Sequence, residues 1–264
     1  MSKSHGALLG GVLVLAAFVA GLVFFYLERP DRSGPIVTEA EGELSDTQKQ
    51  EVRETVRAYL LENPDVIVEA LEILQTRRQQ AEQQRQRGVL AANADRIVDE
   101  RRDPVIGNPD GSVTIVEFFD YQCPYCKRMA QDMFDLAAED PDLRIVFKEF
   151  PVFGTESILA ARAALAAAKQ GKYREFHLAV MNLRGAPSET AVFRLADSLG
   201  LDLDRLRNDM QSQDIEDTIQ ANYRLAQEIG VRGTPAFVVG NELIPGAMSL
   251  DAMRDLIART REES

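Results

Sequence analysis

Val113-Thr-Ile-Val-Glu-Phe-Phe119, followed by Cys123-Pro124-Tyr125-Cys126, is the stretch of this 264-residue chain that decides its fold. The first run predicts a buried β-strand, and residues 127–138 are compatible with a helix. Cys123 then lies at the start of that helix, where unpaired backbone N–H groups and the positive end of the helix dipole stabilise a thiolate. Cys126 follows one helical turn later, within bonding reach of Cys123. Because the chain has no other cysteine, the pair predicts a redox-active dithiol rather than a framework of structural disulfides.

The composition narrows the classes of function. Hydrophobic residues make up 45% of the chain, which is enough for an ordinary globular core. The formal net charge of −12 argues against a nucleic-acid surface, which needs clustered Lys and Arg. The only histidines are His5 and His177, so His-based metal sites and catalytic triads are nearly excluded. We expect no metal and no cofactor beyond the Cys123–Cys126 disulfide, and we expect His177 to be a surface residue.

The N-terminus indicates export. Residues 7–27 are apolar and uncharged, and about 21 residues of this kind can cross a bilayer. Lys3 precedes the stretch, and no clean Ala-x-Ala cleavage site follows it. We favour an uncleaved signal anchor within residues 1–28; a cleaved signal peptide and a buried helix are the alternatives. Either of the first two places the rest of the chain outside the cytoplasm, in a bacterial periplasm, where disulfides persist.

Residues 29–44 have no apolar period and are typical of a linker, whereas residues 45–102 predict a helical segment. Ser45 and Gln48 have the spacing of a capping box, which marks a helix start. The helices of this segment are too small to bury a core alone, so their apolar stripes need a partner. That partner is either the main domain or, as we favour, the same segment of another subunit. The stripes comprise Val52, Val56, Tyr59 and Leu60, then Ile67, Ala70, Leu71 and Leu74.

The main domain is predicted to cover residues 103–264. After the cysteine-bearing helix, residues 143–147 predict a second strand, and a helical block follows at about residues 155–230. Gly240-Asn241 separates two short apolar runs and is a strong hairpin signal, and a last helix begins at Ser249. A dithiol in this order of elements predicts an α/β chain with a thioredoxin-like fold that carries a helical insertion.

Disulfide exchange needs an attacking thiolate, a second thiol that resolves the mixed disulfide, and access for the substrate. We predict Cys123 as the attacker because it is outermost at the helix start, and the more enclosed Cys126 as the resolver. Pro124 suits the first helical position, where its missing N–H leaves no donor unpaired. Tyr125 is predicted to tune the dithiol, since its backbone N–H and ring border the sulfur.

Two motifs together resemble the DsbA-like branch of the thioredoxin superfamily: residues 116–126, which end in the dithiol, and Gly233-Thr234-Pro235-Ala236-Phe237. The resemblance covers roughly residues 103–262. It implies that Pro235 is a cis-proline lying against the cysteines, and that the backbone of Thr234 pairs with substrate peptide like an added strand. Without the cysteines, Thr234-Pro235 would be interpreted as an ordinary turn.

The same resemblance implies a role for two charged residues. Glu117 corresponds to an acid that relays a proton for Cys126, with Lys148 corresponding to a lysine beside it. The alternative is that both side chains are solvated at the ends of their strands, because an unpaired acid is expensive to bury.

The chain departs from the strongly oxidising members of this branch at Tyr125. The dithiol of those members resembles Cys-Pro-His-Cys, with histidine at the position of Tyr125. Losing a potentially cationic neighbour stabilises the thiolate less, so we expect a milder oxidant. Thr234 before the proline is the residue seen in disulfide isomerases. Residues 52–74 resemble the N-terminal helical segment of ScsC-type exported proteins, some of which trimerise through that region.

These observations predict a thiol–disulfide oxidoreductase that acts on cysteine-containing exported polypeptides through the Cys123–Cys126 dithiol. It would work with a membrane or periplasmic redox partner. The direction is oxidation, or isomerisation and reduction if the helical segment assembles dimers or trimers. The alternative from another class is a membrane-tethered chaperone or assembly factor that binds unfolded chains without catalysis.

Overall fold

The structure is a computed structural model that describes residues 44–99 and 101–263. The chain divides into two compact units, one ending at Glu69 and the other running from Ala70 to the C-terminus. Residues 1–28 and 29–43, which include the predicted membrane or signal segment and nearly all of the predicted linker, lie outside the described residues. Among the described residues, no helix combines the length and the apolar character that a membrane span requires.

The described part of the first unit, residues 44–69, is helical. Helix α2 (Asp46–Glu62) begins with the predicted capping box: Ser45 Oγ accepts a hydrogen bond from Gln48 N at 3.3 Å, and Gln48 Oε1 accepts one from Ser45 N at 2.9 Å. No residue of α2 is buried. Helix α3 (Asp65–Ala92) begins in this unit and continues into the second.

The second unit is built on a five-stranded mixed sheet with the order β1-β3-β2-β4-β5. Strands β2 and β3 are parallel, and the other neighbouring pairs are antiparallel. The hairpin predicted at Gly240-Asn241 joins β4 to β5. The strands are β1 (Val105–Gly107), β2 (Val113–Phe119), β3 (Leu143–Glu149), β4 (Ala236–Val239) and β5 (Glu242–Pro245).

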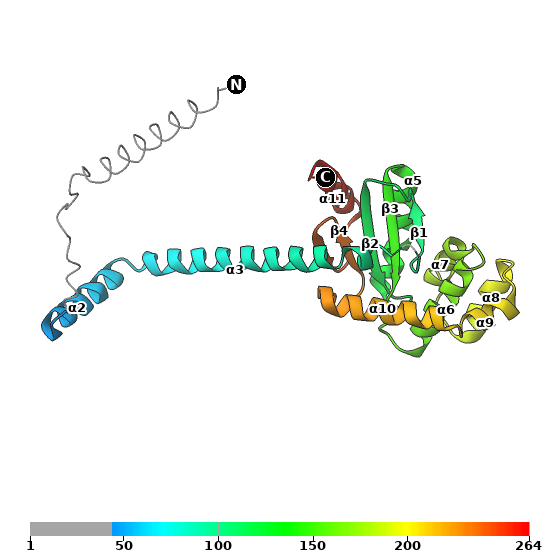
Figure 1. The fold of residues 1–264 in the computed structure, drawn as a ribbon, viewed down its shortest axis with the longest axis horizontal. Helices are drawn as coiled ribbons and strands as arrows, with labels where there is room; N and C mark the ends of the chain where they lie inside the picture. The colour runs from blue at the N-terminus through cyan, green and yellow to red at the C-terminus, as the bar shows by residue number, and fades with distance from the viewer. Residues whose placement is uncertain (1–43, 100, 264) are drawn as a thin grey trace, which may run out of the picture. The chain divides into compact units, whose positions relative to one another are not determined.

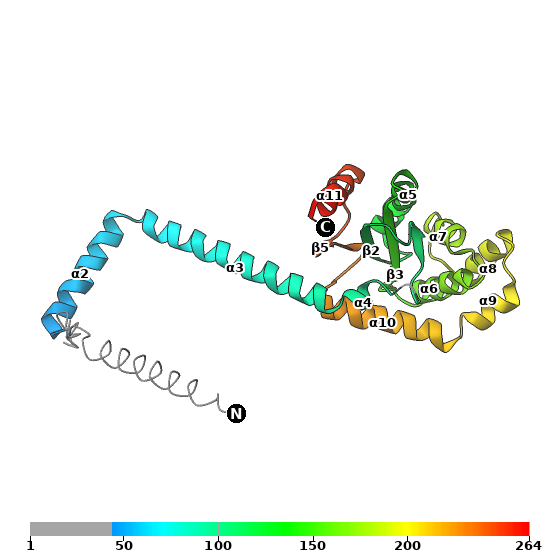
Figure 2. The ribbon, with the colours of Figure 1, turned by 45° about the horizontal axis from the view of Figure 1, so that its top comes forward.

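Helices cover both faces of the sheet, and α6 to α10 fill the range of the predicted helical insertion, about residues 155–230 (Figure 1). In Figure 2, α5 and α11 lie above the sheet, and α4 and α10 lie below it. The helices are α4 (Ala94–Ile97), α5 (Pro124–Glu139), α6 (Thr155–Ala168), α7 (Tyr173–Met181), α8 (Glu189–Ser198), α9 (Leu203–Asp209), α10 (Gln213–Ile229) and α11 (Leu250–Glu263). This arrangement confirms the predicted thioredoxin-like fold with a helical insertion.

Two apolar cores lie on opposite faces of the sheet because alternate residues of a strand point to opposite sides. Ile115 and Phe119 face the core under α5, α7 and α11. Val116 and Phe118 face a second core that includes residues of α10. Leu90, 2% exposed near the end of α3, belongs to this second core, so the end of the long helix packs with the sheet.

Strand β1 is absent from the sequence-based prediction. Its three residues lie in a stretch dense in turn-forming residues, and only their antiparallel pairing with Arg144–Val146 of β3 makes them a strand. A strand this short is stabilised by its neighbour, so local sequence carries little signal for it.

Candidate active site

The dithiol lies at the start of α5, which follows directly after the central strand β2. Cys123 is the N-cap residue, and its Sγ accepts a hydrogen bond from Cys126 N at 3.5 Å. Pro124 occupies the first helical position, as predicted from its missing N–H. The sequence thus places a sulfur where serine or aspartate commonly caps a helix, at the positive end of the helix dipole.

This environment stabilises the Cys123 thiolate. Hydrogen bonds to the sulfur lower the pKa of Cys123 from 9.0 to about 5, the largest effect coming from the Cys126 thiol, while burial opposes the shift. The neighbouring side chain of Thr234 lowers the pKa of Cys123 further. Cys126 differs: burial raises its pKa, and so does its own hydrogen bond to Cys123. The two thiols therefore suit different roles in exchange.

Exposure does not distinguish the two cysteines. Cys123 does lie at the helix start, as predicted, but it is 1% exposed and Cys126 is 0% exposed, so surface area does not separate the two sulfurs. The physical reason is that Thr234 lies over the helix start, with its carbonyl oxygen 3.2 Å from Cys123 Sγ. Hydrogen bonding, rather than exposure, separates the attacking sulfur from the resolving one.

Thr234 and Pro235 come from the segment that leads into β4, about 110 residues after the dithiol. The peptide bond between them is cis, as the resemblance implied. The Thr234 carbonyl oxygen can accept a hydrogen bond from Cys123 only while that thiol is protonated. Pairing of β4 with β2 places this segment beside the start of α5.

Glu117 is buried, so the alternative of a solvated side chain is wrong for this residue. It lies on β2, 2% exposed, on the strand face that packs under α5. Burial is the main cause that raises the pKa of Glu117 from 4.5 to about 8, and the negative charge of Cys123 adds to it. The charge of Glu117 in turn raises the pKa of Cys126. A carboxyl with a pKa near neutrality can exchange a proton at physiological pH.

The prediction that Lys148 lies beside Glu117 is wrong. Glu117 is paired across the sheet with Phe147, so the next residue of β3 points to the opposite face. There Lys148, 1% exposed, forms a 2.5 Å ion pair with Asp103 and donates to the carbonyl oxygen of Arg96 at 2.8 Å. The alternative of a solvated lysine is wrong as well.

His177 is buried at 1% exposure, so the prediction of a surface residue is wrong. Its imidazole packs against aromatic rings, and its centroid lies 4.9 Å from those of Phe119 and Phe147. Nδ1 lies 3.1 Å from the hydroxyl of Tyr121, which also donates to Glu149 at 3.0 Å. Burial lowers the pKa of His177 to about 3, so the ring is neutral at physiological pH.

Asp120 is a site residue that the sequence analysis did not single out. It is 1% exposed, and its carboxylate accepts hydrogen bonds from Gln122 N, just before the dithiol in the chain, and from Ser157 Oγ, well after it. An acid at the end of a buried strand, three residues before the first cysteine, is the signal that points to it.

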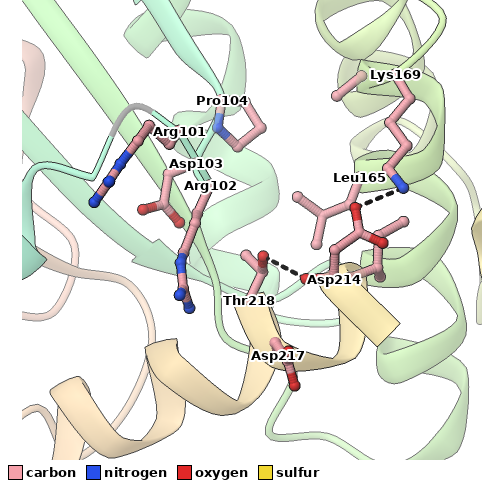
Figure 3. A pocket seen from close by; sticks show the side chains of 11 residues that line it. Arg101, Arg102, Asp103, Pro104, Leu165, Lys169, Asp214, Asp217 and Thr218 are labelled. Atoms are coloured by element: carbon pink, nitrogen blue, oxygen red, sulfur yellow. Dashed lines mark hydrogen bonds and ion pairs between the residues drawn. The ribbon is translucent and has the colours of Figure 1, made fainter. Parts of the chain in front are cut away.

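A cavity of about 380 Å³ outside the dithiol is lined by charged residues (Figure 3). Several of these charged side chains form ion pairs. Lys169 pairs with Asp214 at 2.6 Å, and Arg101 and Arg102 both lie within 3.4 Å of Asp99. The cavity contains neither cysteine, and we assign it no ligand.

The site predicts an acidic titration for Cys123. Its alkylation rate should rise with a midpoint near pH 5, while Cys126 stays unreactive. Because the folded pKa lies below the unfolded value, ionisation stabilises the reduced fold. That stabilisation is complete above about pH 9, is on the order of a few kcal/mol at pH 7, and is lost as pH falls through about 5.

Alkylation at a series of pH values, read by mass spectrometry of each cysteine, measures this midpoint. Two equal midpoints near 8.5, the value of free cysteine, would contradict the site.

Comparison with known families agrees with this geometry. Residues 114–258, more than half of the chain, match the DSBA-like thioredoxin domain. The chain belongs to the DsbA-like family of thioredoxin-fold proteins. Residues 48–81 of this DsbA-like protein also match the copper resistance protein ScsC N-terminal domain, in the helical segment that precedes the sheet.

Solved structures extend the comparison. A thioredoxin-like oxidoreductase from Silicibacter pomeroyi is 44% identical, covering 64% of this chain and 97% of that one with a TM-score of 0.62. A linker-deletion mutant of Proteus mirabilis ScsC is 26% identical over 85% of this chain and all of that one, with a TM-score of 0.64. A periplasmic thioredoxin-like protein from Salmonella enterica is 28% identical, covering 63% and 94%, with a TM-score of 0.58.

The curated relatives are longer proteins. Na(+)/H(+) antiporter NhaA 3 of Salinispora tropica is 31% identical over 158 residues, which cover 59% of this chain. This DsbA-like protein spans about a quarter of that relative's length.

Proposed function

We propose that this DsbA-like protein is a thiol–disulfide oxidoreductase that exchanges disulfides with exported polypeptides. The observation that carries the proposal is the unequal pair of thiols, with Cys123 held as a thiolate at the start of α5 and Cys126 held as a thiol beneath it. The likeness to the thioredoxin-like oxidoreductase from Silicibacter pomeroyi supports it.

Exchange proceeds in two balanced steps. A thiolate of the substrate attacks Cys123 of the oxidised pair, which forms a mixed disulfide and releases Cys126 as the leaving sulfur. The second substrate thiolate then attacks the substrate sulfur of the mixed disulfide, and Cys123 leaves as a stabilised thiolate. The substrate loses two electrons and the dithiol gains them. In the reverse direction Cys126 must lose its proton to resolve the mixed disulfide, and we assign Glu117 as the acceptor.

The neighbours of Cys123 are assigned to tuning and substrate binding. Pro124 starts the helix, and Tyr125, 54% exposed, carries the Arg128 guanidinium 4.3 Å above its ring centroid. We assign the backbone of Thr234, whose carbonyl oxygen lies 3.2 Å from the attacking sulfur, to pairing with an extended substrate peptide, with Pro235 beside it.

The pKa of Cys123 indicates in which direction electrons flow between the dithiol and its substrate. A more stabilised thiolate makes the disulfide a stronger oxidant, and the value of about 5 lies between about 7 for thioredoxin and about 3.5 for DsbA. This supports an oxidant milder than DsbA, in line with the tyrosine at position 125. We therefore expect a reduction potential between about −270 and −120 mV.

Equilibration with glutathione tests the proposal. The fraction of reduced dithiol, measured by trapping thiols in buffers of defined reduced and oxidised glutathione, should give a potential inside that range. A dithiol that fails to equilibrate with glutathione would rule out the proposed function, and a value near −270 mV would favour a reductant.

We propose a periplasmic location with residues 7–27 as the membrane anchor. The support is the apolar length of that segment and the periplasmic description of the Salmonella relative. The partners are cysteine-containing exported polypeptides and a membrane or periplasmic protein that resets the dithiol.

We also propose that the helical segment assembles copies of this chain. Apolar side chains at helical spacing on α2, namely Val52, Val56 and Tyr59, are each more than half exposed. Leu71 continues the pattern on α3 at 59% exposure, and residues 48–81 match the ScsC N-terminal domain. Rows of exposed apolar residues of this kind mark protein–protein contacts. An assembled form would favour isomerisation or reduction.

A charge in the α2 stripe should therefore separate the copies. Light scattering on the chain from residue 44 onward should give a mass two or three times that of one such chain, and Val56→Asp with Tyr59→Asp should reduce it to the mass of one. Gln50→Asp, on the opposite face of α2, is the matched control and should leave the mass unchanged. A single-chain mass without substitution would remove the argument for an oligomer.

A further inference from the structure

Glu149 is a buried carboxyl group to which the proposed mechanism gives no role. It is the last residue of β3 and is 1% exposed. Its Oε1 accepts a hydrogen bond from the Tyr121 hydroxyl at 3.0 Å and another from the Tyr173 hydroxyl at 3.2 Å. No ion pair in the part of the chain that the structure describes includes Glu149. The carboxyl therefore meets uncharged donors and no counterion.

The charged groups around Glu149 also favour its neutral form. Burial raises the pKa of the carboxyl well above its usual value of 4.5. The two tyrosine hydroxyls oppose this shift in pKa, and the negative charges of Asp120 and Asp103 add to it. The ammonium group of Lys148 lies on the opposite face of the sheet, where it pairs with Asp103 at 2.5 Å. Asn222, a buried polar residue of α10, donates to the main-chain carbonyl oxygen of Glu149 at 3.2 Å and brings no charge.

The same hydrogen bonds connect three elements near the dithiol. Tyr121 lies in the loop between β2 and α5, two residues before Cys123, and its hydroxyl is also 3.1 Å from His177 Nδ1. Tyr173 and His177 both belong to α7, and burial lowers the pKa of the imidazole to about 3, so it carries no charge. Arg174, which lies between them in sequence, places its guanidinium over an aromatic ring of α5. One carboxyl therefore links β3, α7 and the dithiol loop, residues 120–123.

An ionised carboxyl in this place would be a buried charge without a partner, which costs far more than a neutral carboxyl that accepts the same hydrogen bonds. We propose that Glu149 holds a proton in the folded protein at neutral pH, and that the neutral carboxyl is the positioning group that holds the dithiol loop against α7 through Tyr121. Glu149 acts through Tyr121 and not on either sulfur. The inference goes beyond the proposed function, because the exchange reaction does not use this proton.

A bound proton makes the stability of the fold depend on pH. The unfolded chain releases the proton above about pH 4.5, whereas the folded protein keeps it to a higher pH, so Glu149 destabilises the fold progressively as the pH rises. Glutamine at this position is neutral at every pH and has no such dependence. The folding equilibrium constant of Glu149→Gln relative to the wild type should therefore rise with pH, by up to about 10-fold per pH unit.

Urea unfolding of the full chain and its variants between about pH 5.5 and 7.5 measures this ratio. Cys123 and Glu117 are present in both proteins, so their contributions cancel. Glu175→Gln, at an exposed position of α7, is the matched control, and its ratio to the wild type should not change with pH. Infrared spectra at pH 7 give a second measurement, because the band of a protonated carboxyl should be weaker in Glu149→Gln than in the wild type.

A ratio that stays constant or falls as the pH rises would overturn the bound proton, because a Glu149 that is ionised in the folded protein gives one of these results. An infrared band of equal strength in Glu149→Gln and the wild type would overturn it as well.

Tyr121→Phe tests the link to the dithiol loop. Loss of the hydroxyl should raise the alkylation midpoint of Cys123 by up to about one pH unit, the equivalent of one weakened hydrogen bond to its sulfur. Glu149→Gln should leave the midpoint near 5, because the neutral amide keeps an acceptor for Tyr121. An unchanged midpoint in Tyr121→Phe, or an equal shift in Glu149→Gln, would overturn the positioning role. If Tyr121→Phe does not fold, the measurements on Glu149→Gln decide the proposal.

Discussion

Cys123→Ala should abolish thiol–disulfide exchange, and Cys126→Ser should stop it at the mixed disulfide. At pH 7 a pKa of about 5 leaves about 99% of Cys123 ionised, whereas the raised pKa of Cys126 leaves less than about 1%. Ionisation alone therefore gives Cys123 an advantage of about 100-fold as nucleophile. Loss of Cys123 should lower the rate with peptide dithiols by at least that factor, because the remaining thiol, Cys126, is held protonated.

The two variants differ in what accumulates. After mixing with oxidised glutathione, intact-mass measurement should show one glutathione on Cys126→Ser and none on Cys123→Ala. Glu117→Gln should slow the release of the mixed disulfide without slowing its formation, because it removes the proposed proton acceptor for Cys126. An adduct on Cys123→Ala at a comparable rate would reverse the assigned roles.

The Cys123→Ala variant also tests whether the protein acts as an enzyme or as a membrane-tethered chaperone. A chaperone that binds unfolded chains through its exposed apolar side chains would function without Cys123. Undiminished cellular function of Cys123→Ala would therefore support the chaperone.

Lys148→Met should destabilise the fold by about 3–5 kcal/mol. The substitution leaves Asp103, 4% exposed, without the ammonium group that now lies 2.5 Å from its carboxylate. Breaking a buried ion pair by removing one partner has a cost of this size because the remaining charge is uncompensated. Burial already raises the pKa of Asp103 and Lys148 opposes that shift, so the loss should shrink at low pH, where the acid is neutral.

Urea unfolding of the wild type and the variant at pH 7 measures the effect. Lys148→Met combined with Asp103→Asn is the matched control and should recover most of the loss, since no buried charge remains. Lys148→Met should leave the alkylation midpoint of Cys123 unchanged, because Lys148 lies on the sheet face opposite Glu117. A shifted alkylation midpoint would show that Lys148 does influence the active site.

The sequence analysis identified the strand, the dithiol and the helix start because these features depend on neighbours within a few residues. An N-cap cysteine, a proline at the first helical position and an apolar run are readable from spacing alone. The hairpin at Gly240-Asn241 and the capping box at Ser45 are local in the same sense.

The wrong predictions concern partners that are distant in the chain. Whether Lys148 meets Glu117 depends on the register of β3 against β2, and a shift of one residue reverses the face on which a side chain lies. His177 lies on α7, and only the docking of this helix onto Phe119 and Phe147 buries it.

The chemistry follows from local sequence, namely one strand, one helix start and two sulfurs, because helix ends are local structures. The residues that surround the two sulfurs depend on the tertiary structure. Thr234 reaches Cys123 from 111 residues away, and Asp120 binds a segment more than 30 residues further along the chain. Such contacts arise from strand pairing and helix docking, which no local pattern specifies.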